Sequence, residues 1–279
     1  MVSEKQTLDG KVTVITGGGT GLGKAMALAL AKAGSNIVVA ARRTGPIEQT
    51  AREVTDLGRR ALAIPTDVTD SQQVNRMIET ALSEMGKINI LINNAGIVRG
   101  QGRKPIWEIT DEEWHLGIDT NLSSAFFCCR AVSQHFIERK SGKVINVASG
   151  EGLRGVRDNY MYCSAKGGVI QLTRTLALTW AQDNIKVNCI VPGFVDTREL
   201  QPDARPEVPP EVARASRSLG EFIPVGRLGI PGDIAALALF LASDASDYIT
   251  GGIYTADGGG LAGGTTTTGY APTIPIKEE

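Results

Sequence analysis

Long hydrophobic segments are absent from this sequence of 279 residues. Its longest uninterrupted apolar run is IAALALFLA, residues 234–242, well short of the ~20 residues that a helix needs to cross a bilayer. The beginning of the chain, MVSEKQTLDGK, lacks the apolar core of a secretion signal. We therefore expect neither a membrane-spanning nor a secreted protein, and we expect a cytoplasmic localisation.

Cysteine, histidine and net charge are also scarce. The four cysteines form no CxxC pair, which favours reduced thiols over disulfides. The two histidines, His115 and His135, have no partner at ligand spacing, so no metal site is expected. The formal charge is −1, and acidic and basic residues are interspersed along the chain, so nucleic acid is not an expected partner.

Short apolar runs that alternate with longer helical patterns are what the sequence does contain. The expected strands are 11–16, 36–40, 61–65, 88–93, 143–148, 185–191 and 252–256. The expected helices are 21–33, 46–57, 71–85, 121–138, 162–182 and 231–242, and TDEE at 110–113 predicts one more helix start. Nearly continuous apolar strands are typical of strands that are covered on both faces. The order predicts an α/β fold, a single-domain, Rossmann-like, doubly wound parallel sheet of about seven strands with helices on both faces.

Two segments interrupt the alternation within and after a domain expected to span 1–260. Residues 198–227 contain five prolines and are either a lid over a substrate site or a long surface connection. Residues 261–279 are poor in core-forming residues, and this C-terminal extension is either disordered or docked on another subunit.

A glycine-rich turn follows the first expected strand. Gly17, Gly21 and Gly23 have the spacing G-x-x-x-G-x-G between a strand and a helix, where a tight turn and free helical N–H groups suit a pyrophosphate. A carboxylate that selects NAD(H) is expected about 20 residues later. The sequence there has Ala41, Arg42 and Arg43, and a guanidinium such as that of Arg42 suits a 2′-phosphate. The sequence thus favours NADP(H), with NAD(H) possible if these arginines are surface charges.

A series of motifs in a fixed order makes the chain resemble the short-chain dehydrogenase/reductase family. They are TGGGTGLG (16–23), DV (67–68), NNAG (93–96), Asn121 in DTNLSS, Ser149 in NVASG, YCSAK (162–166), VPGFVDT (191–197), GRLGIPGDIA (226–235) and ITGG…DGG (249–259). Within the family the chain is most similar to 3-oxoacyl-acyl-carrier-protein reductases and to related carbonyl reductases and sugar-alcohol dehydrogenases. The motifs cover nearly all of residues 8–260.

The resemblance implies a catalytic set of Asn121, Ser149, Tyr162 and Lys166. Tyr162 and Lys166 are spaced i, i+4 and share a helix face, whereas Tyr160 lies six residues from Lys166 and does not. A phenol has an ordinary pKa of about 10, and a nearby ammonium is expected to lower the pKa of Tyr162. By resemblance, Tyr162 is the acid/base, Lys166 holds the nicotinamide ribose, Ser149 binds the substrate oxygen and Asn121 anchors a water-linked proton path.

The resemblance also implies a set of cofactor contacts. They are Gly17, Thr20, Gly21, Leu22, Arg42, Asp67, Val68, Asn94, Tyr162, Lys166, Val195 and Thr197. Asp67 and Val68 would face the adenine and Asn94 its ribose, although Asn93–Gly96 also fits a structural strand end. Thr20 stands where many NADPH-dependent members have a basic residue, which weakens the preference for NADP(H).

The sequence leaves three hypotheses for the function. The first is NADPH-dependent reduction of a 3-oxoacyl or general carbonyl compound; the second is NAD(P)⁺-dependent oxidation of a polyol, sugar acid or other secondary alcohol; the third is a non-catalytic dinucleotide-binding scaffold. Charged residues are expected near the pocket mouth: Arg99, Arg103, Arg154, Arg157, Glu151 and Asp158. They either recognise a substrate anion or remain solvated. The resemblance further implies a homodimer or homotetramer, built through the helices that start near 121 and 162 and through the C-terminal strand.

Overall fold

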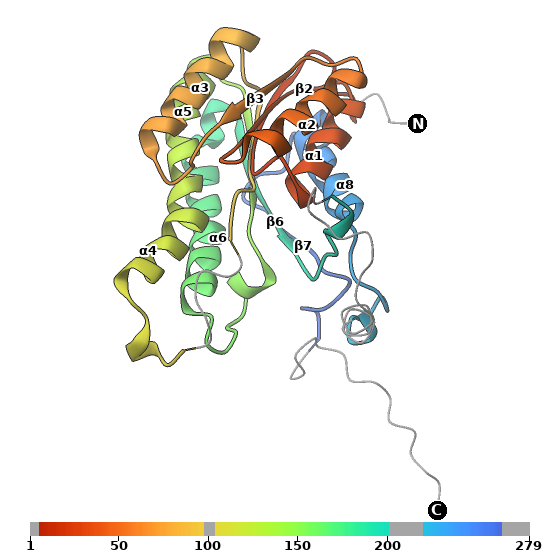
Figure 1. Ribbon diagram of the computed structural model, residues 1–279. Helices are drawn as coiled ribbons and strands as arrows, with labels where there is room; N and C mark the ends of the chain where they lie inside the picture. Colours follow the sequence, from red (N-terminus) through yellow and green to blue (C-terminus); the bar gives the residue numbers. More distant parts are fainter. Residues whose placement is uncertain (1–5, 98–103, 201–219, 264–279) are drawn as a thin grey trace, which may run out of the picture.

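The computed structural model describes residues 6–97, 104–200 and 220–263 of the chain. A seven-stranded sheet with the order β3-β2-β1-β4-β5-β6-β7 forms its centre (Figure 1), and every neighbouring pair of strands is parallel. The strands are β1 (Val12–Thr16), β2 (Asn36–Ala41), β3 (Ala61–Pro65), β4 (Ile90–Asn93), β5 (Gly142–Val147), β6 (Ile185–Pro192) and β7 (Ile253–Ala256). The strand order reverses between β1 and β4, and in such sheets ligands bind beyond the carboxyl ends of the strands at this reversal.

Helices cover both faces of the sheet (Figure 1). One face carries α1 (Gly21–Lys32), α2 (Thr44–Asp56) and α8 (Pro231–Ala242); the other carries α3 (Ser71–Met85), α5 (Ser124–Arg139) and α6 (Tyr160–Trp180), with α4 (Asp111–Ile118) packed against α6. The shorter turns are η2 (Ile106–Glu108), η3 (Asp119–Ser123, a π-helix), η4 (Gly150–Gly152), η5 (Ala181–Asp183), η6 (Arg198–Leu200) and η7 (Asp244–Ser246). The expected α/β fold with a doubly wound parallel sheet is therefore confirmed.

Alternating side chains of each strand enter the two cores. Ile37 and Val39 of β2 lie in the core under α1 and α8, while Val38 and Ala40 lie in the core under α3 and α5. Successive strand residues point to opposite faces, so both sets must be apolar when helices cover both sides. This explains why the strands read as continuous apolar runs rather than as alternating patterns.

Helix starts differ from the sequence expectations in three places. The helix expected from residue 46 begins at Thr44, because Pro46 lies in its first turn, where a missing N–H costs nothing. The helix expected from 121 is α5, and the π-helical turn η3 precedes it. The helix expected from 162 begins at Tyr160. The capping box at Thr110 is confirmed, since its hydroxyl accepts from Glu113 N at 3.2 Å and the Glu113 carboxylate accepts from Thr110 N at 3.1 Å.

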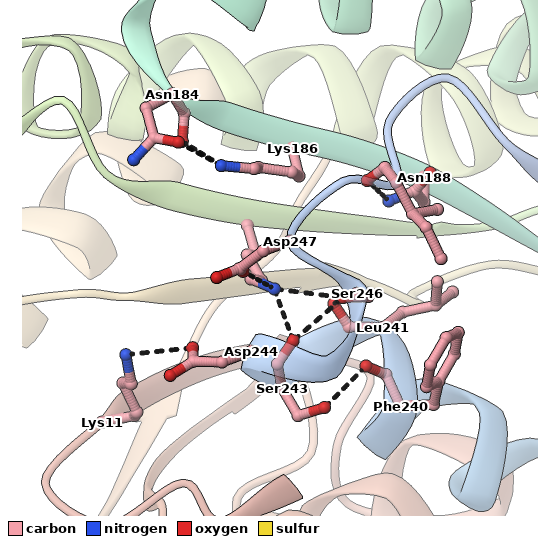
Figure 2. Close-up of polar contacts among 12 residues, drawn as sticks. Lys11, Asn184, Lys186, Asn188, Phe240, Leu241, Ser243, Asp244, Ser246 and Asp247 are labelled. Carbon is pink, nitrogen blue, oxygen red and sulfur yellow. Dashed lines mark hydrogen bonds and ion pairs between the residues drawn. The ribbon is translucent and has the colours of Figure 1, made fainter. Parts of the chain in front are cut away.

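A polar network ties the chain after α8 to the amino edge of the sheet (Figure 2). Nζ of Lys143, at the start of β5, donates to Ser243 O at 2.5 Å and to Ser246 Oγ at 3.0 Å, and lies 2.8 Å from the Asp247 carboxylate. Lys11, which precedes β1, lies 3.6 Å from Asp244. These contacts hold η7 and fix the approach to β7.

The residues on either side of the proline-rich segment pair with each other. Val195 and Gly229 form an isolated parallel bridge, in which Asp196 N donates to Gly229 O at 2.9 Å and Gly229 N donates to Phe194 O at 2.9 Å. Of the expected lid at 198–227, residues 201–219 lie outside the described part, as do residues 264–279 of the extension. No helix within the described ranges combines the length and the apolar character that crossing a membrane requires.

Candidate active site

Two adjoining clefts lie at the carboxyl edge of the sheet. The glycine cleft, of about 420 Å³, is formed by the residues that follow β1, β4, β5 and β6. The side cleft, of about 240 Å³, lies between η4, the residues after β6 and the residues after β7. Ser149 and Tyr162 line both clefts, so these two side chains lie where the clefts meet.

The glycine-rich turn forms one wall of the glycine cleft. Gly17 and Gly21 have φ values of +66° and +52°, which side chains rarely tolerate. A Cβ on Gly23 would lie 2.2 Å from Gly17 O, so only glycine allows α1 to pack this closely against the turn. The helix N-terminus after Thr20 presents backbone N–H groups and a positive dipole, an arrangement that fits a pyrophosphate.

Asn94 lines the cleft, but its amide nitrogen already has partners. It donates to Thr16 O at 3.0 Å and to Gly17 O at 3.2 Å, while Thr16 Oγ1 accepts from Asn94 N and Ala95 N at 3.1 Å. These bonds fix the glycine-rich turn relative to β4. The contacts favour the structural interpretation of this motif.

Asn121 sits in the π-helical turn η3 and is 2% exposed. Its Oδ1 accepts from Ile97 N at 3.1 Å, and its Nδ2 donates to Ile97 O at 3.1 Å and to Gly117 O at 2.9 Å. A Cβ on Gly96 would lie 2.7 Å from Asn121 Oδ1 and 3.4 Å from Lys166 Nζ. Gly96 therefore lets the amide and the ammonium approach the same space, and π-turns of this kind are frequent at functional sites.

Tyr162 and Lys166 lie one turn apart on α6, as their spacing predicts. Lys166 Nζ is 5.7 Å from the centre of the Tyr162 ring and donates to Val147 O, at the end of β5, at 2.9 Å. Lys166 is only 4% exposed. Burial lowers the pKa of its ammonium to about 8, because the charged form loses hydration.

Burial raises the pKa of the Tyr162 phenol above its ordinary value. A hydrogen bond with the Ser149 hydroxyl lowers it in part, and the charge of Glu151 raises it further. The expectation that Lys166 lowers this pKa is wrong for this structure, because desolvation of the phenol outweighs the other influences. The phenol therefore holds its proton at neutral pH.

Comparisons with known proteins agree with this geometry. A family model described as short chain dehydrogenase matches residues 11–207. The chain belongs to the short-chain dehydrogenase family. It is 39% identical to the 2-dehydro-3-deoxy-D-gluconate 5-dehydrogenase of Escherichia coli K12, over 94% of this chain and 100% of that protein. It is 35% identical to the 3-oxoacyl-[acyl-carrier-protein] reductase of Synechocystis sp., over 90% and 97%.

A solved structure extends the comparison. A candidate 2-deoxy-D-gluconate 3-dehydrogenase from Agrobacterium tumefaciens, crystallised with NADP, superposes with a TM-score of 0.80 at 35% identity, covering 93% of this chain and 100% of that one. This short-chain dehydrogenase is therefore an oxidoreductase of the class that interconverts secondary alcohols and ketones and binds a nicotinamide cofactor.

Most of the cofactor contacts that the sequence predicts in this short-chain dehydrogenase line the glycine cleft. They are Gly17, Thr20, Gly21, Leu22, Asn94, Tyr162, Lys166, Val195 and Thr197. Arg42, Asp67 and Val68 do not line it: Arg42 is exposed after β2, and the other two follow β3, where Asp67 Oδ1 accepts from Thr69 N at 3.0 Å. No group of three potential metal-ligating side chains gathers within the described ranges.

The charged residues expected near the pocket mouth separate into two sets. Glu151 and Arg154 line the side cleft. The Arg157 side chain is 94% exposed and lies 3.5 Å from Asp158, which also accepts from Tyr160 Oη at 3.4 Å. Arg99 and Arg103 lie outside the described residues.

Several apolar residues of the side cleft were not predicted from the sequence. Phe194, Ile223 and Leu261 come from three separate segments, which local spacing does not bring together. Asp257 belongs to the DGG motif, and its position after β7, at the carboxyl edge, was the available signal. Its carboxylate accepts from Gly259 N at 3.0 Å and Leu261 N at 2.8 Å, so it shapes the turn that carries Leu261.

Proposed function

We propose that this chain is an NADP(H)-dependent reductase of ketones, with Tyr162 as the proton donor. The observation that carries the proposal is the position of Ser149 and Tyr162 at the junction of two clefts, one suited to a dinucleotide and one to a small substrate, with Lys166 beside Tyr162 in the first. A non-catalytic scaffold has no chemical need for a buried lysine beside a half-buried phenol and a serine hydroxyl.

The chain's own residues divide the work of the reduction. When bound, the nicotinamide cofactor supplies the hydride that adds to the carbonyl carbon. Tyr162 donates its proton to the carbonyl oxygen, so that the ketone becomes a secondary alcohol. The Ser149 hydroxyl hydrogen-bonds the same oxygen and stabilises its developing charge. Lys166 and Asn121, which approach each other beside Gly96, hold the ribose and a water through which Tyr162 regains a proton.

The pH dependence of turnover in each direction follows from the phenol. A proton donor is ready at neutral pH because burial raises the pKa of Tyr162. Oxidation of an alcohol requires the deprotonated form, and we expect it to become efficient only at alkaline pH. The two directions therefore differ in their pH optima, with reduction favoured near neutrality.

The cofactor preference is assigned to NADP(H) through Arg42. Its side chain is exposed at the end of β2, where the 2′-phosphate of an adenine ribose is expected. Binding of NADP in the Agrobacterium tumefaciens relative supports this assignment. Arg42→Asp should shift the ratio of kcat/KM for NADPH over NADH by about 10- to 100-fold toward NADH, since a carboxylate repels the phosphate. Arg157→Asp, at an exposed site outside both clefts, is the matched control; an unchanged ratio in Arg42→Asp would remove the assignment.

Two substrate classes remain after the comparisons, a 3-oxoacyl thioester and a sugar acid or polyol. Relatives of both kinds align over nearly the whole chain. Glu151 and Arg154 in the side cleft favour the second class, because an acyl chain would displace water from these two charged side chains, whereas a sugar acid offers them hydroxyls and a carboxylate.

We also assign self-association to the exposed apolar residues of α5 and α6. Phe126 and Ile137 on α5 are 44% and 38% exposed, and Leu178 on α6 is 83% exposed. Tyr248, near β7, is fully exposed and marks a second candidate contact. Light scattering distinguishes a dimer or tetramer from the 29.5 kDa monomer.

Exchange of one tyrosine tests the proposal most directly. Tyr162→Phe removes the donated proton and should lower kcat by about 10²- to 10⁴-fold while cofactor binding persists. Tyr160→Phe is the matched control, because its hydroxyl contacts Asp158 and lines neither cleft. Steady-state kinetics over a panel of ketones, with cofactor affinity from fluorescence titration, provide the measurement. Substantial turnover by Tyr162→Phe would refute the assignment, and inertness of the wild-type chain despite tight cofactor binding would revive the scaffold.

A further inference from the structure

Two residues of opposite charge lie three positions apart in the side cleft. Glu151 belongs to the short turn η4, and Arg154 follows it, with its backbone N–H donating to Gly150 O at 3.2 Å. Both line the side cleft together with Ser149 and Tyr162. Proton donation and cofactor binding use neither charge.

The Glu151 carboxylate is held in place before any substrate arrives. Asn159 Nδ2, just before α6, donates to Glu151 Oε2 at 2.6 Å. The backbone N–H of Glu151 donates to Ser149 Oγ at 3.2 Å. A Cβ on Gly152 would lie 2.6 Å from the carbonyl carbon of Lys166, so this glycine lets η4 pack directly on α6. The charge of Glu151 raises the pKa of Tyr162. Glu151 is therefore a fixed acceptor close to the reacting phenol.

Arg154 lies where the side cleft adjoins a second cavity. It lines the side cleft and also a neighbouring cavity of about 830 Å³, whose wall includes Arg227 and Asp233. Ser149, Glu151 and Tyr162 do not line that second cavity. A substrate that extends from Tyr162 through the side cleft into the second cavity thus passes Glu151, which lines only the side cleft, and Arg154, which lines both.

We propose that Glu151 and Arg154 determine substrate specificity, and that they select a short hydroxylated oxo acid whose ketone is distant from its carboxylate. Arg154 binds the substrate carboxylate, for which a guanidinium is the best-matched partner. Glu151 accepts a hydrogen bond from a hydroxyl beside the reacting carbon. This inference rests on the proposed function, since it takes Tyr162 as the point where the ketone reacts.

The same pair disfavours two other substrate classes. A 2-oxo acid would bring its carboxylate toward Glu151 when its ketone reaches Tyr162. The two negative charges would then repel each other. An acyl thioester would cover Glu151 with apolar groups and leave its charge desolvated. The selection therefore depends on where the acid lies along the substrate as well as on its presence.

Three probes and two substitutions test the inference. The probes are 5-oxo-D-gluconate, with a distant ketone and hydroxyls; D-fructose, a ketose without a carboxylate; and 2-oxo-D-gluconate, with the ketone next to the carboxylate. Arg154→Gln should raise KM for 5-oxo-D-gluconate by about 10- to 100-fold and change kcat and the KM for D-fructose by less than about 3-fold. Arg157→Gln, three residues farther along and 94% exposed, should change none of these values. Glu151→Gln should improve the use of 2-oxo-D-gluconate relative to 5-oxo-D-gluconate, because it removes the repulsion.

The outcomes separate the inference from the proposed function. Equal effects of Arg154→Gln on the acid and on D-fructose, no effect on either, or a wild-type preference for D-fructose or 2-oxo-D-gluconate would each overturn the inference and leave the role of Tyr162 intact. Calorimetry with the chain loaded with NADP⁺, which carries no hydride, measures binding of 5-oxo-D-gluconate without turnover. Binding that depends on Arg154 without any reduction would overturn the proposed function alone, and failure of the wild-type chain to bind this acid would overturn the inference.

Discussion

A lysine ammonium lies at each end of strand β5, half-buried Lys143 of the strand itself at one end and buried Lys166 of α6 at the other, and the two have different surroundings. At the amino end, Lys143 Nζ contacts two oxygens of the η7 region and the Asp247 carboxylate. At the carboxyl end, Lys166 Nζ donates to Val147 O, and among the described residues no carboxylate forms an ion pair with it. Burial lowers the pKa of both ammonium groups. Asp247 offsets this lowering in part for Lys143, whereas the pKa of Lys166 falls to about 8.

These different surroundings indicate that Lys143 is a structural charge and that Lys166 is available to ligands. An ammonium whose donors are satisfied by the fold contributes to stability and has little left to offer a ligand. An ammonium that is buried with one carbonyl partner is costly to the fold and keeps donors for a ribose or a phenol. We expect substitutions at the two positions to have opposite effects on stability and activity.

Lys166→Met should have the largest effect, and it should fall on activity. We expect kcat to fall by about 10²- to 10³-fold, because the phenol loses its neighbouring cation and the ribose its donor. The free energy of unfolding at pH 7 should rise, by about 1–3 kcal/mol, since an apolar side chain avoids the cost of burying the charge. Steady-state kinetics and urea unfolding measure the two quantities. A clear loss of stability would show that Lys166 supports the fold in the way Lys143 does.

Lys143→Met should show the reverse. Loss of three contacts at the amino edge should lower the free energy of unfolding by about 1–3 kcal/mol, while kcat changes by less than about 3-fold, because the network lies at the opposite edge from both clefts. Asp247→Asn provides the matched control: it keeps the lysine and weakens one contact, and its effect on stability should be smaller. A loss of activity at full stability would contradict the separation of roles.

The smallest expected effect is a shift of one titration. A ¹³C or ¹⁵N signal of the Lys166 side chain, assigned with Lys166→Arg, should titrate near pH 8 in the cofactor-free chain, whereas an unfolded lysine titrates near 10.4. The unfolded chain then binds more protons between these values, so the contribution of this group to stability grows as pH rises from about 8 to about 10.4. Lys166→Met should lose this increase. A midpoint above 10 would remove the distinction between the two lysines.

The contacts of Lys166 were easier to predict from the sequence than those of Lys143. Tyr162 and Lys166 are four residues apart on one helix, so local spacing was enough to pair them. The partners of Lys143 come from residues about 100 positions later, which no local pattern connects. The strands were found to within about two residues because both of their faces are apolar, a signal contained in the run itself.

Quantities that depend on three-dimensional surroundings were predicted less well. The predicted direction of the Tyr162 pKa shift was wrong, because the spacing of charges can be read from a sequence and the desolvation of a side chain cannot. The apolar side of the substrate cleft was missed, since Phe194, Ile223 and Leu261 meet only after the sheet has formed. Arg154 and Arg157 look alike in sequence, yet one lines a cleft and the other is solvated.

The bridge between Val195 and Gly229 has a consequence for the length of the segment that it closes. It joins two points of the chain just beyond β6 and before α8, so the sequence between them can change in length without displacing either element. Doubling the length of a closed loop costs only about 0.6 kcal/mol. Insertions and deletions in this segment are therefore expected to leave the catalytic residues of α6 in register. One pair of backbone contacts thus separates the length of this segment from the placement of the catalytic residues.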